Sequence, residues 1–76
     1  MLDPHLEICV ENECERIMSE VGRYPLDWMT EIAENAQENW TEGGFLDYDA
    51  AEDEITGHAD QYIYFMKENY PEEVNK

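Results

Sequence analysis

Basic residues are scarce in this sequence. Lys and Arg together number 4 against 20 Asp and Glu, so the 76 residues carry a formal net charge of -16. Direct binding to nucleic acid is not expected, because phosphates are bound by Lys and Arg side chains that displace counterions. Anionic membrane surfaces repel the chain for the same reason. The partner that this charge favours is a basic protein surface.

Long apolar runs and a disulfide framework are also lacking. No run approaches the roughly 18 apolar residues of a membrane span, and the first 20 residues lack the basic and apolar regions of a signal peptide. The two cysteines, Cys9 and Cys14, point about 140° apart on one predicted helix, so they cannot be joined by a disulfide. Free thiols are typical of a reducing compartment. We therefore predict a cytoplasmic protein that does not interact with membranes.

Motifs for phosphate or metal binding are missing as well. There is no glycine-rich phosphate loop and no His-Glu-x-x-His zinc motif. Residues 47–58 begin like a calcium-binding loop, but Ala51 and Glu52 occupy its fifth and sixth positions, and His58 replaces the bidentate Glu. We therefore expect no specific metal site.

Nucleophilic catalysis would need a thiol beside an imidazole. Cys9 or Cys14 with His5 or His58 could form such a pair. Both cysteines, however, lie on or beside an apolar stripe, where free Cys is commonly buried, and no pair of carboxylates stands out in an apolar pocket. We predict that the protein is not an enzyme and has no catalytic residues and no cofactor.

What the sequence does contain is 42% hydrophobic and 12% aromatic residues, more than a disordered acidic tail has. Apolar residues recur at helical spacing in three segments, which lie at about 3–21, 25–40 and 49–69. This pattern predicts an all-α fold, a small three-helix bundle forming one domain over residues 1–76. The predicted core residues are Leu6, Val10, Ile17, Ile32, Ala36, Ile55, Tyr62 and Met66.

Turn and cap residues define the predicted helix ends. Asp3-Pro4 begins the first helix and Val21-Gly22 ends it; Gly43-Gly44 ends the second. Asp49 is the predicted cap of the third helix, with Glu52 completing a capping box, and Pro71 ends that helix. Glu13 falls inside the apolar arc of the first helix, so either the helix bends there or the carboxylate extends past its neighbours. Residues 62–65 also have β-propensity.

Acidic residues follow the helical period on all three segments. The second segment carries them opposite its apolar stripe, without basic residues between them. Like charges at this spacing repel, and the net charge is at least twice the 2–8 that solubility requires of a small domain. These periodic residues are Asp27, Glu31, Glu34 and Glu38 on the second segment, Glu7, Glu11 and Glu15 on the first, and Asp49, Asp53 and Asp60 on the third.

Carboxylates at this spacing approximate the phosphates of a nucleic-acid strand, which predicts binding to a basic nucleic-acid-binding protein by mimicry. In size, acidity and lack of catalytic motifs the chain resembles the small acidic proteins that phages encode against host defences, including anti-restriction and anti-CRISPR proteins. Residues 40–44 and 58–65 also look like segments of small phage proteins. The resemblance implies an inhibitor of a host defence protein, acting in the host cytoplasm.

Two other interpretations remain open. Antitoxins and nuclease immunity proteins also neutralise basic partners, with aromatic anchors inside a ring of carboxylates; Tyr64 and Trp28 lie off the apolar arcs and are candidates for such anchors. Alternatively, the chain is an adaptor or assembly protein whose acidity serves only solubility. Three short helices can leave an apolar face that a second copy would cover, so a homodimer is also open.

Overall fold

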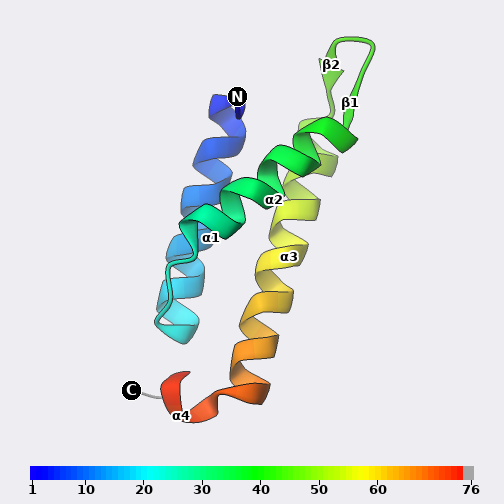
Figure 1. The fold of residues 1–76 in the computed structure, drawn as a ribbon. Helices are drawn as coiled ribbons and strands as arrows, with labels where there is room; N and C mark the ends of the chain where they lie inside the picture. The colour runs from blue at the N-terminus through cyan, green and yellow to red at the C-terminus, as the bar shows by residue number, and fades with distance from the viewer. Residues whose placement is uncertain (75–76) are drawn as a thin grey trace.

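The computed structural model describes residues 1–74 and contains a bundle of three α-helices (Figure 1). The helices are α1 (Pro4–Val21), α2 (Leu26–Asn39) and α3 (Tyr48–Asn69). A hairpin of two short strands, β1 (Thr41–Glu42) and β2 (Phe45–Leu46), joins α2 to α3, and a short helix α4 (Pro71–Val74) follows α3. The all-α, three-helix class that the sequence predicts is confirmed.

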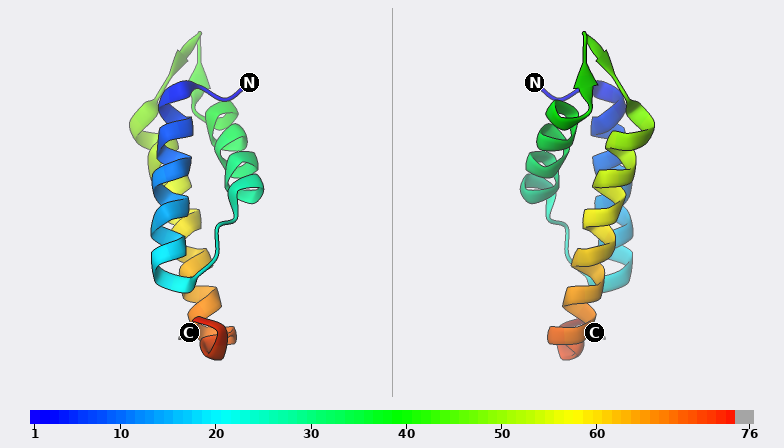
Figure 2. Two further views of the ribbon diagram at one scale, coloured as in Figure 1. Left: turned by 90° about the vertical axis from the view of Figure 1, so that its left-hand side faces the viewer. Right: turned by 90° about the vertical axis from the view of Figure 1, so that its right-hand side faces the viewer.

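The helix α2 lies across one side of the pair formed by α1 and α3 (Figures 1 and 2). α1 and α3 run in the same direction and α2 runs in the opposite one, and each helix contacts the other two. α3 has 22 residues and α2 has 14, which correspond to lengths of about 33 and 21 Å. α2 therefore covers only part of α3, and the C-terminal end of α3 extends past it towards α4.

The ends of α1 lie where the sequence predicts them. The side chain of Asp3 accepts a hydrogen bond from the backbone N–H of His5 at 2.9 Å, and Pro4 is the first helical residue. At the other end, Gly22 has a φ of 73° and donates its N–H to the carbonyl of Met18 at 2.9 Å. This left-handed conformation favours glycine, so Gly22 ends the helix.

The predicted cap of the third helix is wrong by two residues. Asp47, not Asp49, is the cap, and its side chain accepts from the backbone N–H of Ala50 at 3.1 Å. Asp49 lies in the first turn, where a negative charge is favourable beside the positive end of the helix dipole. Glu52 completes no capping box, because its carboxylate pairs with His5 of α1.

The hairpin between α2 and α3 is absent from the sequence-based prediction. Glu42 pairs with Phe45 across a turn in which Gly43 and Gly44 have φ values of 59° and 84°. Positive φ at both central residues is the pattern of a tight hairpin turn, which glycine adopts without strain. The two glycines therefore form this turn, and α2 ends earlier, at Asn39. Residues 62–65, in spite of their β-propensity, belong to α3.

The core lies between the three helices and contains most of the predicted residues. Ile32 and Tyr62, however, are only partly buried and pack against the core, and Ile63 takes the buried position on α3. Leu26 and Trp40, which extend the apolar stripe of α2 in the sequence, are exposed. The buried residues are Leu2, Leu6, Val10, Cys14, Ile17, Val21, Met29, Ala33, Ala36, Ala51, Ile55, Ala59, Ile63 and Met66.

Candidate functional site

The acidic stripe of α2 lies opposite its buried residues. Asp27, Glu31, Glu34 and Glu38 are all exposed, while Met29, Ala33 and Ala36 are buried. Within residues 1–74, none of these four carboxylates makes a hydrogen bond or an ion pair. Their charges are therefore open to solvent and to any partner.

The acidic row of α1 borders the same side of the bundle. Glu7, Glu11 and Glu15 are exposed, and Glu7 and Glu11 line a shallow groove together with Leu26 and Thr30 of α2. Two carboxylates of the α1 row thus lie at the groove where α1 and α2 meet, while the α2 row lies on the outward side of α2. We call the seven carboxylates the acidic face: Glu7, Glu11, Glu15, Asp27, Glu31, Glu34 and Glu38.

Ion pairs gather at a different place, where α1 meets α3. The Arg16 Nη2 atom lies 2.6 Å from the Glu13 Oε1 atom and 2.8 Å from the Asp60 Oδ1 atom. Lys67 of α3 pairs with Glu20 of α1 at 2.6 Å. These carboxylates hold the pKa of Arg16 above its ordinary value, with the hydrogen bond to Glu13 as the main cause.

The same ion pairs explain how α1 accommodates Glu13. The helix continues unbroken through this residue. Its carboxylate, with 14% of the side chain exposed, turns to the edge of the helix and pairs with Arg16 one turn later. A residue inside the apolar arc is thereby tolerated, because its charge is neutralised at the α1–α3 edge.

The acidic row of α3 is not brought to the acidic face. Asp60 lies at the edge where α3 meets α1 and is paired with Arg16. Asp49 and Asp53 are exposed on α3, and their side chains make no ion pair or hydrogen bond within the described part of the chain. Of the three predicted acidic rows, that of α1 lies at the junction with α2, whereas that of α3 does not.

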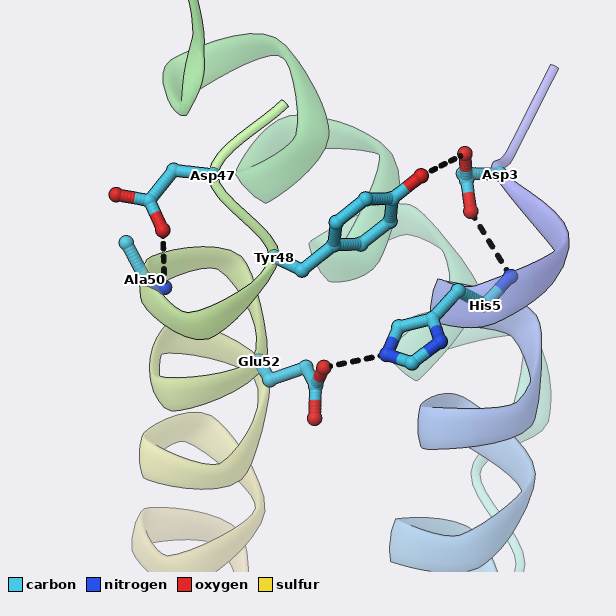
Figure 3. A network of polar contacts seen from close by, with 6 residues as sticks. All are labelled: Asp3, His5, Asp47, Tyr48, Ala50 and Glu52. Carbon is cyan, nitrogen blue, oxygen red and sulfur yellow. Dashed lines mark hydrogen bonds and ion pairs between the residues drawn. The ribbon is translucent and has the colours of Figure 1, made fainter. Parts of the chain in front are cut away.

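A polar network joins the beginnings of α1 and α3 (Figure 3). The His5 Nε2 atom lies 2.6 Å from the Glu52 Oε2 atom, and the ring of His5 packs edge-on against Tyr48 with centroids 4.8 Å apart. The hydroxyl of Tyr48 donates to Asp3 at 2.9 Å, and this bond is the main cause that raises the pKa of Tyr48. These contacts give His5 a structural role, because they connect α1 to α3. Sequence reasoning missed the network because its members are far apart in the chain.

The two predicted aromatic anchors lie in different places. Trp28, 40% exposed, packs against Tyr62 with ring centroids 5.2 Å apart and against His58 at 6.5 Å. It lines a hollow together with Gln61, Tyr62 and Phe65, which we call the aromatic groove. Tyr64, 69% exposed, does not line this groove. Sequence reasoning assigned Tyr62 to the core and overlooked Phe65, which follows it by three residues on the same side of α3.

The thiols are poorly suited to nucleophilic catalysis. Burial, followed by the nearby carboxylates of Glu52 and Glu13, raises the pKa of Cys9 to about 11. Burial also raises the pKa of Cys14. A reactive cysteine needs a lowered pKa, since the thiolate is the nucleophile. Within residues 1–74 no hydrogen bond joins either thiol to an imidazole.

The described residues contain neither a cluster of metal ligands nor a membrane-spanning helix. No group of three or more His, Cys, Asp or Glu side chains in the described residues is placed to hold a metal ion. None of the helices over residues 1–74 is long and apolar enough to cross a membrane. Comparison with known proteins gives no match to any family model, curated protein or solved structure. The acidic face and the aromatic groove are therefore the features from which a function can be inferred.

Proposed function

We propose that this protein is an inhibitor that binds a basic nucleic-acid-binding protein through the acidic face. The Cβ atoms of neighbouring acidic residues along each helix are about 5–6 Å apart, similar to successive phosphates along a strand. Lys and Arg side chains that are placed to bind phosphates would accept them in the same way. The protein would thus occupy the nucleic-acid site of its partner, as anti-CRISPR and other anti-defence proteins of phages do in the host cytoplasm.

The observation that carries this proposal is the separation of charge within the bundle. Arg16 and Lys67 neutralise carboxylates at the α1–α3 edge, whereas the four carboxylates of α2 make no ion pair within residues 1–74. Solubility alone would be served by the mixed-sign surface that small domains usually have. A one-signed row on one helix costs stability through repulsion, which favours a role in binding.

Two variants with the same net charge test the proposal. The stripe variant combines Glu31→Gln, Glu34→Gln and Glu38→Gln. The paired variant combines Glu13→Gln, Glu20→Gln and Glu52→Gln, which are carboxylates already engaged by Arg16, Lys67 and His5. Because each removes three acidic charges, a difference between them reports the position of the charges and not their number.

The assay is capture of proteins from a nuclease-treated bacterial lysate on the immobilised chain. We expect nucleic-acid-binding proteins on the wild type and on the paired variant, eluted by DNA or RNA and by salt, because the Debye length falls from about 10 Å at 0.1 M to about 3 Å at 1 M. The stripe variant should bind the captured partner at least about tenfold more weakly. Equal capture by both variants, with no competition from nucleic acid, would show that the acidic face is only a solvated surface and does not bind the partner.

A second candidate function is an antitoxin or immunity protein that neutralises a basic toxin or nuclease. The half-exposed position of Trp28 in the aromatic groove favours it, since exposed aromatic side chains often anchor such interfaces. A captured partner that is a toxin, retained by the stripe variant and lost on Trp28→Leu, would support this function over nucleic-acid mimicry.

A further inference from the structure

The aromatic groove exists because α2 is shorter than α3. Trp28 lies in the first turn of α2, and α3 continues beyond this point with Phe65 exposed and Tyr62 partly buried. Phe65 is 52% exposed and its ring contacts Tyr70 at a centroid distance of 6.0 Å. Two of the rings that line the groove, those of Trp28 and Phe65, are thus exposed, although a small protein usually buries such large apolar side chains.

Two exposed carboxylates lie on the helices that form the groove, each near one of its rings. Glu31 follows Trp28 by three residues on α2, and Glu68 follows Phe65 by three residues on α3, which places each about one helical turn from the ring. Both are exposed and make no hydrogen bond or ion pair within residues 1–74. The groove therefore combines aromatic faces with negative charge, the combination that binds cations.

Charge decides between the occupants of this groove. A second copy of the chain would bring a net charge of -16 against another of -16, together with its own Glu31 and Glu68. A basic occupant meets no such repulsion. Among basic side chains, the planar guanidinium of Arg stacks on aromatic faces, whereas the ammonium of Lys is a compact and strongly hydrated charge.

We propose that the aromatic groove binds an arginine side chain of the basic partner, stacked against Trp28 or Phe65. This proposal rests on the proposed function and adds to it. Proteins that bind single-stranded nucleic acid stack Arg and aromatic side chains on bases. The groove offers rings in the place of bases, and the acidic face beside it offers carboxylates in the place of phosphates.

The test uses two peptides of equal charge, nona-arginine and nona-lysine, titrated into the full chain by isothermal calorimetry at low salt. We expect the wild type to bind nona-arginine about two- to fivefold more tightly than nona-lysine, the effect of one cation–π contact at an exposed site. Phe65→Leu and Trp28→Leu should abolish this preference. Tyr64→Leu and Phe45→Leu, which alter exposed rings outside the groove, should retain it.

Circular dichroism checks that each variant is folded. If Trp28→Leu does not fold, the test rests on Phe65→Leu alone. Equal affinity of the wild type for both peptides, or a preference that survives Phe65→Leu, would overturn the proposal. A dimer in analytical ultracentrifugation that disappears in Phe65→Leu would also overturn it, because the groove would then belong to a second copy.

The stripe variant separates this proposal from the proposed function. We expect it to bind both peptides more weakly and by the same factor, because its carboxylates attract either cation. If the stripe variant bound both peptides as well as the wild type does, the acidic face would not be a binding surface. An arginine preference that is lost on Phe65→Leu would still establish the groove in that case.

Discussion

Neutralising the acidic stripe of α2 should stabilise the fold. The stripe variant removes three like-charge contacts along α2, between residues 27 and 31, 31 and 34, and 34 and 38. Each such contact costs about 0.2–0.5 kcal/mol. Glu38 also lies in the last turn of α2, which has no basic residue, and a negative charge there opposes the helix dipole by a few tenths of a kcal/mol or more.

The free energy of unfolding should therefore rise by about 1–2 kcal/mol at low ionic strength. Gln and Glu have similar helix propensities, so the substitution itself is neutral in this respect. For a domain of this size the melting temperature should increase by at least about 4 °C. Thermal denaturation followed by circular dichroism in 0.01 M salt measures the effect directly.

Salt and the paired variant provide the controls. The gain should shrink in 1 M salt, where the Debye length is about 3 Å. The paired variant loses the same number of charges but also the contacts of Glu13, Glu20 and Glu52 with Arg16, Lys67 and His5, so it should gain no stability. A stripe variant that melts at or below the wild-type temperature in 0.01 M salt would refute the idea that these carboxylates lack partners.

Three further predictions concern the caps and the thiols. Asp47→Ala should cost about 1 kcal/mol in urea denaturation because it removes the cap of α3, and Asp49→Ala should cost less. Cys9 and Cys14 should react slowly with a disulfide reagent at pH 8 in the native state and rapidly in urea, since burial raises the pKa of both. The pKa of Cys9 in the folded protein, about 11, exceeds its ordinary value of 9.0. The contribution of this thiol to the free energy of unfolding should therefore be full below pH 9 and should decrease as the pH rises towards 11. In a Cys9→Ala variant the free energy of unfolding should decrease less over this pH range.

The helix ends show what local sequence can and cannot predict. Asp3, Gly22 and Pro71 act through their own backbone neighbours, so their positions follow from the sequence alone. The start of α3 does not, because Asp47 and Asp49 both fit a cap. The hairpin was missed because strands of two residues are too short to show an alternating pattern, although a Gly-Gly pair is a hairpin signal.

The proposed binding surfaces also differ in how far the sequence predicts them. Exposure of the α2 carboxylates follows from helical period, since they lie opposite the buried residues. The aromatic groove and the ion pairs of Arg16 depend on which helices are neighbours and on how far α2 extends along α3. These features arise from tertiary packing, so they cannot be predicted from the spacing of residues within one segment. Tyr62 illustrates this, because it borders the core and the groove at once.

The ion pairs of Arg16 and Lys67 make the charge of the bundle uneven as well as negative. The region of these two residues is closer to neutral, whereas the α2 carboxylates make no ion pair within residues 1–74. In the field of a basic partner, such a molecule experiences a torque as well as an attraction, and it rotates until α2 leads. Encounters would then begin in the docking orientation, so fewer of them would be lost to collisions through the wrong side.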